Sequence, residues 1–477
     1  MTGRPSPDLR DGLSRDIEKF VRIAVSGPSA TILRSSASTS SEEEGATRRR
    51  KVLVVGGTGR VGGSAARHVH VLSVEGDAGG VGVELLLGGR SLSSFESGRD
   101  RIVSQLRRDS VPVPPISFLR LDLTNPPSIL ADMIRSCGAD GVVNTAGPFQ
   151  RRTTTALLEA CIEAGVPYVD VCDEPALCAR GRELSDAAGE KGIAAVTAAG
   201  IWPGASALMV ARAADELRRL DALDDADSDG SGGGEEAGRE LSEVDVVMSF
   251  FTAGTGNAGA TIVSATFLLL CQSALTVVNG DEVEKEPWTE PLDVDFGGDE
   301  GVKRVRLLDN PDVFTLYRSV PGVRNLCSRF ATAPGLWNQL FGAMKALIPK
   351  EILSDTDLMQ GLSVFSLPII RAVDLLVGAT NAMRVDVTSA RSGRRCKFSV
   401  THRDLEQCAG LATAAFILEL MDHGGSGIGG KNEKDGGPLT STIRPGVYYP
   451  AELPLESRER ILELVRRDAI VWDFETS

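Results

Sequence analysis

The stretch KVLVVGGTGRVGG, residues 51–63, constrains the fold more than any other part of the chain. Its apolar run, 52–55, is typical of a strand that is covered on both faces of a parallel sheet. The glycines that follow have the spacing Gly57-x-Gly59-x-x-Gly62, which permits a tight strand-to-helix turn and a close approach of the backbone to a phosphate. The first turn of the next helix then directs its N–H groups at a pyrophosphate. The stretch therefore predicts a dinucleotide-binding βα unit.

Strand and helix patterns alternate from this point to about residue 205. Further strands are expected at residues 83–89, 116–123, 139–147, 166–172 and 192–200, with helices at 129–135 and 153–165. Alternation with short turns predicts a doubly wound parallel sheet. Ligands of such sheets bind beyond the carboxyl ends of the strands, so we expect the functional site at that edge.

The pattern changes from residue 244 onward. Strand-like segments at 244–254, 302–308, 383–390 and 396–402 predict an open mixed or antiparallel sheet, and an Ala-rich helix follows them. The expected fold is α/β, a doubly wound Rossmann domain with an inserted α+β domain and a C-terminal return segment. The expected parts are a disordered tail (1–50), a Rossmann dinucleotide-binding domain (51–205), an α+β substrate or dimerisation domain (206–405) and a segment that packs back on the first domain (406–477).

Composition argues against several classes of protein. The net charge of −14 and the lack of a basic stripe disfavour a general nucleic-acid binder. Eight scattered cysteines without a CxxC pair, and only four histidines, argue against structural zinc. No run of apolar residues is long enough to span a membrane. The apolar region Leu336–Ile348 leaves two alternatives, a helix on a membrane surface or a helix packed in a core or dimer interface, and the second is favoured.

Four polar regions are expected to lie outside the folded core. The N-terminal tail lacks the apolar region of a secretory signal, and its acidic residues are atypical of organelle transit peptides, so plastid and cytoplasm both stay open. The acidic, glycine-rich segments 222–240 and 423–438 are predicted to be solvated loops, and 74–82 is predicted to be a lengthened loop.

Arg90 indicates which nicotinamide cofactor would bind. The second strand ends in LLLGGRS, where an acid would bind the ribose 2′-OH and an arginine would accommodate a 2′-phosphate. Arg90, with Ser91 beside it, favours NADP over NAD, because a guanidinium matches a phosphate in charge and geometry. The alternative is a solvated loop residue. Asp122 is expected either to meet the adenine amino group or to form a cap or Asx-turn at the strand end.

Three stretches resemble the saccharopine dehydrogenase-like NADP-binding family: GGTGRVGGS, NTAGPFQ…LLEACIEAGVPYVDVCDE and TAAGIWPGASALMVA. Downstream, SFFTAGTGNAGATI, RFATAPGLWN, VTHRDL and RPGVYYPAEL resemble a plastid and cyanobacterial branch of that family. The resemblance implies a Rossmann domain that binds NADP(H), and an inserted domain that often forms a homodimer. It implies a phosphate loop at Gly57, Thr58, Gly59, Arg60, Val61 and Gly62, and a loop beside the nicotinamide at Ala146, Gly147, Pro148 and Phe149. Many members have a glycine and an aromatic residue after GPF, whereas this chain has residues 150–153, QRRT, so no family substrate is carried over.

Hydride transfer also needs a group that moves a proton. None of the four tyrosines has a lysine four residues later, which excludes the standard short-chain dehydrogenase mechanism. The catalytic candidates are Tyr168, Asp170, His402 and Gln150, and Asp173 clusters with the first two. Their alternative roles are strand-end capping and packing for the tyrosine and the aspartates, and a structural role for His402. Gln150, with Arg151 and Arg152, could instead bind an anionic substrate or belong to a charged surface.

The predicted function is an NADP-dependent oxidoreductase that transfers a hydride between the nicotinamide and a small-molecule carbonyl or imine. The alternative is a catalytically inactive, NADP-bound regulatory or scaffold protein.

Overall fold

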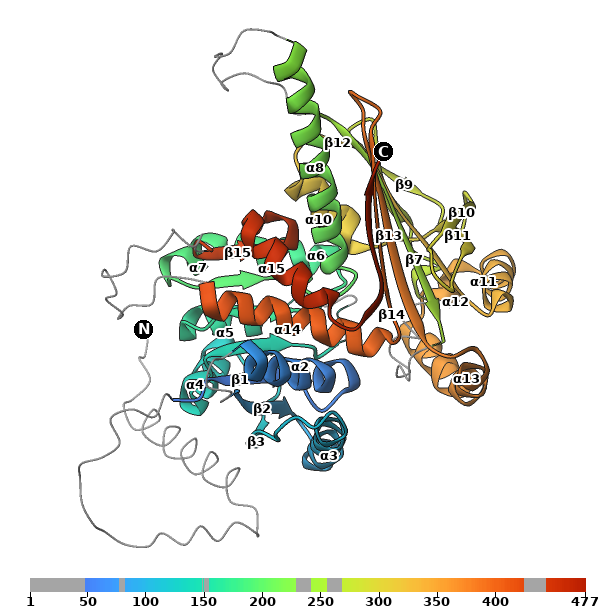
Figure 1. Ribbon diagram of the computed structural model, residues 1–477. Helices are drawn as coiled ribbons and strands as arrows, with labels where there is room; N and C mark the ends of the chain where they lie inside the picture. The colour runs from blue at the N-terminus through green and yellow to red at the C-terminus, as the bar shows by residue number, and fades with distance from the viewer. Residues whose placement is uncertain are drawn as a thin grey trace, which may run out of the picture.

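The chain forms two sheets, joined by long helices (Figure 1). The computed structural model describes residues 48–76, 82–147, 149, 154–228, 242–254, 268–423 and 443–477. Pro148 and Gln150 lie outside the described residues, as do most of the expected tail and parts of all three expected loops.

The first sheet has seven strands in the order β15-β6-β5-β4-β1-β2-β3, and every pairing is parallel. Strands β1 to β6 follow the order of a dinucleotide-binding fold, which confirms the prediction of a doubly wound sheet. The bounds are β1 Lys51–Val55, β2 Glu84–Gly89, β3 Ile116–Arg120, β4 Gly141–Asn144, β5 Tyr168–Asp170, β6 Ala194–Val196 and β15 Gly446–Tyr448.

Helices cover both faces of this sheet. One set comprises α2 (Arg60–Gly76), α3 (Leu92–Arg108) and α14 (Leu405–His423), and the other α4 (Pro127–Cys137), α5 (Ala156–Ala164) and α7 (Ser185–Glu190). Alternate side chains of β1 point to opposite faces, so Val52 and Val54 pack with the first set while Leu53 and Val55 pack with the second. This two-sided burial explains the continuous apolar run in the sequence.

The second sheet is mixed, as predicted. Seven of its strands follow the order β10-β11-β12-β7-β13-β14-β16, and β8 pairs with β12 and β9. The β12–β7 pairing is parallel and the others are antiparallel. The bounds are β7 Val244–Ala253, β8 Ala274–Val278, β9 Asp281–Lys285, β10 Leu292–Asp295, β11 Val302–Leu307, β12 Val323–Ala333, β13 Thr380–Ser389, β14 Arg395–His402 and β16 Ala469–Thr476.

The remaining helices connect or flank the two sheets. They are α6 Pro175–Glu183, α8 Ala205–Ser228, α10 Pro311–Ser319, α11 Gly335–Leu347, α12 Lys350–Leu353, α13 Thr356–Val377, α15 Leu455–Arg466 and the short 3-10 helix η1 Pro450–Glu452. Helix α8 continues into the segment that was expected to be a loop from residue 222. Asp221 accepts a hydrogen bond from Ser389 (2.7 Å), and Asp224 pairs with Arg394 (2.5 Å), so these acidic residues hold the last turns against the β13–β14 hairpin.

The C-terminal segment contributes to both sheets. Helix α14 lies along α2 (Figure 1), and a Cβ at Gly410 would come closer than 3.0 Å to the Ser64 side chain and the Ala65 backbone. Glycine at this position therefore permits the close approach of the two helices. Strand β15 then extends the first sheet, whereas β16 pairs with β14 in the second. The domain boundary expected at residue 405 stays a prediction.

A buried carboxyl group joins the two parts of the molecule. Asp312, at the start of α10, is fully buried and accepts hydrogen bonds from the Ser206 hydroxyl and from the Gly204 N–H (3.2 Å). Burial raises the pKa of Asp312 to about 7, against the two hydrogen bonds, which lower it. Helix α10, which belongs to the part that carries the second sheet, is thereby tied to the start of α8.

Helices α11 and α13 lie beside the second sheet (Figure 1), and both carry exposed apolar side chains. Phe341 and Met344 of α11 are buried, but other large apolar side chains on the two helices are open to solvent. We define the apolar face as Leu336, Leu340, Leu347, Val364, Phe365, Ile369 and Leu375, whose exposure ranges from 43% to 88%. No helix within the described ranges is long and apolar enough to cross a membrane.

Candidate functional site

The turn between β1 and α2 is built to receive an anion. Gly56 has a φ of +80°, and the N–H of Gly59 donates to the Gly56 carbonyl (2.8 Å), which closes the turn. The first helical hydrogen bond runs from the Gly63 N–H to the Gly59 carbonyl (3.0 Å). The N–H groups of Arg60, Val61 and Gly62 precede that bond, so they have no acceptor within the helix and are available to a phosphate.

The loop after β4 lies directly against this turn. Thr145 donates to the Val55 carbonyl from both its N–H (2.8 Å) and its hydroxyl (3.0 Å). A Cβ at Gly62 would come closer than 3.0 Å to the Thr145 hydroxyl and the Gly56 carbonyl. The structure thus brings the predicted phosphate loop and the predicted nicotinamide loop, Ala146 and Gly147, to one edge of the sheet.

Arg101 of α3 supports the turn from outside. Its guanidinium donates to the carbonyls of Thr58 (3.1 Å) and Gly59 (2.6 Å). Because these carbonyls are held on the side of α3, the opposing N–H groups of the turn keep their direction towards a bound phosphate. No sequence motif marks this arginine, which follows Thr58 by 43 positions.

The side chain of Arg60 turns towards α14. It forms an ion pair with Glu406 (3.5 Å), whose carboxylate is only 7% exposed. The contribution of Arg60 to phosphate binding is therefore expected to come from its backbone N–H. Glu406 is a residue that sequence reasoning missed, since its contact with the turn depends on how α14 returns to α2.

The residues expected at the adenosine end lie together after β2 and β3. Arg90 is exposed, and Ser91 is the N-cap of α3, where its hydroxyl accepts from the Ser94 N–H (3.3 Å). Asp122 forms an Asx-turn by accepting from the N–H and the hydroxyl of Thr124. These bonds lower the pKa of Asp122, and the charge of Arg90 lowers it further. An anionic group bound beside the negatively charged Asp122 would therefore need the positive charge of Arg90 to offset the repulsion between the two anions.

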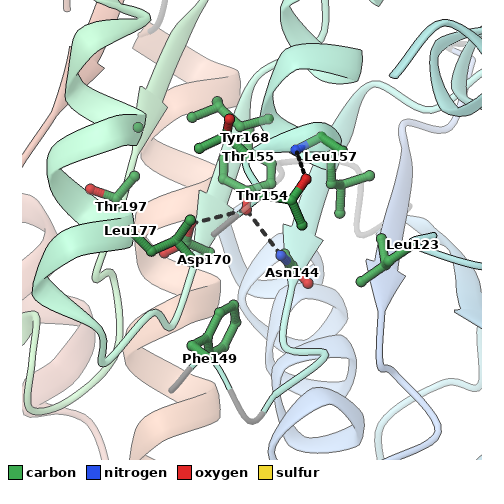
Figure 2. A pocket seen from close by; sticks show the side chains of 13 residues that line it. Leu123, Asn144, Phe149, Thr154, Thr155, Leu157, Tyr168, Asp170, Leu177 and Thr197 are labelled. Atoms are coloured by element: carbon green, nitrogen blue, oxygen red, sulfur yellow. Dashed lines mark hydrogen bonds between the residues drawn. The ribbon is translucent and has the colours of Figure 1, made fainter. Parts of the chain in front are cut away.

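A buried hydrogen-bond chain links the carboxyl ends of β4 and β5 (Figure 2). The Asn144 amide donates to the Tyr168 hydroxyl (3.0 Å), which donates to Asp170 (2.9 Å). The other oxygen of Asp170 accepts from the backbone N–H groups of Cys172 (3.0 Å) and Ala198 (2.9 Å). The adjoining cavity measures about 40 Å³, which accommodates water but not a substrate.

Burial determines the protonation of this chain. It raises the pKa of Tyr168 well above its usual value, and that of Asp170 to about 6. All the hydrogen bonds of Asp170 run inward, to the backbone and to Tyr168. The geometry therefore fits the strand-end capping alternative for these two residues, and a catalytic role for them stays a prediction.

Other candidates are distributed around the same edge. Phe149 is 5% exposed and packs with Cys172, Cys178 and Tyr449 (Figure 2 shows it below Asp170). Asp173 follows β5, and burial raises the pKa of its carboxyl to about 7. His402 does not line the cavity of Tyr168 and Asp170; it lines a separate cavity beside α2. No cluster of potential metal ligands occurs in the described part of the chain.

Comparison with known proteins identifies the first domain. Residues 52–196 match the model of the saccharopine dehydrogenase NADP binding domain. No functionally curated protein matches the sequence. Among solved structures, saccharopine dehydrogenase (L-Glu forming) from Saccharomyces cerevisiae is similar with a TM-score of 0.56 at 13% identity, covering 90% of this chain and all of that one.

The homospermidine synthase of Legionella pneumophila, solved in complex with NAD, has a TM-score of 0.54 at 10% identity and covers 90% of this chain and 92% of that one. At these identities the two likenesses show the fold, whereas the domain match shows an NADP-binding domain of the type found in oxidoreductases.

Proposed function

Because the chain carries the NADP-binding domain of the saccharopine dehydrogenase-like family, we propose that it is an NADP(H)-dependent oxidoreductase acting on a small carbonyl or imine. The observation that carries the proposal is the turn at residues 56–62, whose free N–H groups and lack of side-chain bulk suit a pyrophosphate. When bound, the nicotinamide supplies the hydride chemistry. The residues of the chain bind and orient the nicotinamide, and one of them holds the proton that is transferred to the substrate.

The preference for the phosphorylated cofactor is assigned to Arg90. We expect Arg90→Ala to weaken NADP(H) binding by about 10- to 100-fold, because a charge-assisted bond to phosphate contributes about 1.5–3 kcal/mol. NAD(H) affinity should change by less than about twofold, since NAD lacks the 2′-phosphate. Fluorescence titration of both cofactors measures the difference, with Arg107→Ala as the control at an exposed arginine of α3. An equal loss for both cofactors would contradict the role.

The proton is assigned to Asp173. Asp173 follows β5 at the same sheet edge as the turn at residues 56–62, and burial raises the pKa of its carboxyl to about 7, which suits a proton donor. Tyr168 is less suited, because its pKa is raised and its hydroxyl is already engaged with Asp170. We expect Asp173→Asn to lower kcat by about 100-fold or more while leaving NADPH affinity within about twofold.

The proposed activity and the role of Asp173 are both tested by measuring NADPH oxidation in the presence of pools of carbonyl compounds mixed with amines. Turnover by the wild type and its loss in Asp173→Asn would support the proposal, with Asp186→Asn as a control at a carboxylate of α7. Tight NADPH binding without turnover of any pool would favour the regulatory or scaffold alternative. No affinity for either nicotinamide cofactor would overturn both.

The apolar face is assigned to contact with a second copy of the chain. Helices that bind anionic membrane surfaces carry an excess of Lys and Arg. The described exposed charges near the apolar face show no such excess: two are positive, Lys350 and Arg371, and three are negative, Glu351, Asp355 and Asp357. Closed homo-oligomers are the common way for a soluble chain to cover such a surface.

We expect Phe365→Glu to convert a dimer into a monomer in sedimentation or light scattering, because it places a charge within the apolar face, where Phe365 is 77% exposed. Leu455→Glu is the matched control, at an exposed leucine of α15 outside the apolar face. A wild type that is monomeric at micromolar concentration would contradict this assignment without bearing on the proposed activity.

A further inference from the structure

A second cavity lies where α2 meets the corner between β14 and α14 and the turn before β16. Its volume is about 440 Å³, and it is bounded by segments that are far apart in the sequence. It is distinct from the Tyr168–Asp170 cavity, with which it shares no lining residue. The proposed oxidoreductase function makes no use of it.

One wall of this cavity is a closed hydrogen-bond network. Arg67 pairs with Asp109 (2.5 Å) and donates to His68 Nε2 (2.9 Å) and to the Gln407 side-chain oxygen (3.4 Å). Since an arginine only donates, His68 Nε2 is an acceptor, and its Nδ1–H donates to the Ser64 carbonyl (2.9 Å). His68 is thus a neutral imidazole with both nitrogens engaged, and neither His68 nor Arg67 is free to bind a ligand.

His402, at the end of β14, also lines the cavity, but unlike His68 it has one ring nitrogen without a hydrogen-bond partner among the residues described. The side chain is 3% exposed, and its ring holds a hydrogen bond with the backbone of Asp468. Its Nε2 is buried and has no hydrogen-bond partner within the described part of the chain. Burial lowers the pKa of His402 to about 4, so the ring is neutral and Nε2 offers a lone pair. An unpaired buried acceptor costs about 1–3 kcal/mol, which a donor group on a ligand would recover.

Besides Arg67, three charged side chains line the cavity. Asp404 accepts a hydrogen bond from the Gln407 N–H (3.0 Å), which leaves two charges of opposite sign at the rim. Arg403 and Asp468 both line the cavity and are exposed, and neither has an ion-pair partner among the residues described. Asp468 is held in the left-handed region, with a φ of +61°, a conformation that aspartate and asparagine tolerate better than most residues. Leu411 and Cys408 provide an apolar part of the lining.

From this arrangement we propose that the cavity beside α2 binds a small zwitterion that carries a primary ammonium group and a carboxylate. The ammonium group donates to His402 Nε2 and pairs with Asp468, and the carboxylate pairs with Arg403. The apolar part of the ligand lies against Leu411. A ligand with one charge only would leave one rim residue uncompensated, which gives the site its selectivity.

The test uses the full-length protein with its nucleotide site saturated by NADPH, so that a change in occupancy of that site does not affect the measured binding of the zwitterion. The standard L-amino acids and norvaline are screened by thermal shift, and the strongest is titrated by calorimetry against its decarboxylated amine and its deaminated acid. For norvaline these are butylamine and pentanoate. We expect the zwitterion to bind at least about tenfold more tightly than either analogue, the effect of losing one charged contact.

Substitutions at the rim locate the binding. Arg403→Gln and Asp468→Asn should each weaken binding of the zwitterion by about tenfold or more. Asparagine at position 468 tolerates the left-handed backbone conformation. The control Arg108→Gln, at an exposed arginine of α3, should bind as the wild type does. At the buried position, His402→Gln should retain more binding than His402→Leu, because only the amide supplies an acceptor.

Three outcomes would overturn the proposal: no stabilisation of the wild type by any amino acid, equal binding of the amine or acid analogue, or binding that both rim variants leave unchanged. The rim residues are exposed, so their variants test the site without depending on the folding of the His402 variants.

Discussion

Replacing Gly62 by alanine is expected to weaken NADP(H) binding by about 100-fold or more, which corresponds to about 2.8 kcal/mol. The added Cβ would come closer than 3.0 Å to the Thr145 hydroxyl and the Gly56 carbonyl, a separation that real Cβ atoms do not show. Either the turn or the β4 loop must move, and the N–H groups that face the pyrophosphate would move with it. Because Thr145 is anchored on Val55 by two hydrogen bonds, it cannot yield by a change of rotamer alone.

The matched control is Gly76→Ala, in the same helix. A Cβ at Gly76 meets nothing within 4 Å, so NADPH titration of this variant should reproduce the wild type. Circular dichroism of Gly62→Ala separates a local effect on the turn from loss of the fold. A folded Gly62→Ala that keeps wild-type affinity would show that the turn does not hold the cofactor.

The second large effect concerns Asp312 and the dependence of stability on pH. The pKa of Asp312 is raised to about 7 in the folded protein, from a usual value of 3.8. The stability that its protonated form contributes is complete below about pH 4 and is lost as the pH rises through about 7. Between about pH 5 and pH 8 we expect the wild type to lose about 2–3 kcal/mol of unfolding free energy relative to Asp312→Asn. Urea unfolding of both proteins at the two pH values measures this difference.

Asp293→Asn is the control for this experiment. The pKa of Asp293 is lowered by its hydrogen bonds with Arg304, so its contribution to stability is lost only as the pH falls below the usual carboxyl range. The difference between wild type and Asp293→Asn should therefore stay constant between about pH 5 and pH 8. The same constancy in Asp312→Asn would mean that Asp312 is not a buried, proton-dependent link between α10 and α8.

Local rules were sufficient to predict strands β1 to β6 of the first sheet from the sequence, but they did not predict β15. The apolar run at 52–55 and the glycine spacing after it express backbone and burial requirements within a few residues, and both appear in the structure as expected. The mixed second sheet was predicted for the same reason, from alternation in 244–254 and 383–390.

Contacts between distant segments could not be predicted in this way. Arg101 supports the turn from α3, and Glu406 reaches Arg60 from α14, and neither contact has a local signature. The acidic, glycine-rich composition of residues 222–240 predicts a loop, whereas α8 continues to Ser228. Its helical turns depend instead on Ser389 and Arg394, which the second sheet brings there.

The seventh strand of the first sheet has a consequence for how the protein is made. Strand β15, Gly446–Tyr448, pairs with β6, although some 250 residues separate them, and α14 covers α2 across an even longer separation in sequence. On the ribosome, the cofactor-binding half would therefore emerge with an unprotected edge strand and an uncovered helix until nearly the whole polypeptide has been synthesised. A chain cut short after β14 would lack α14 and β15, and we expect it to aggregate during translation rather than yield a nucleotide-binding fragment.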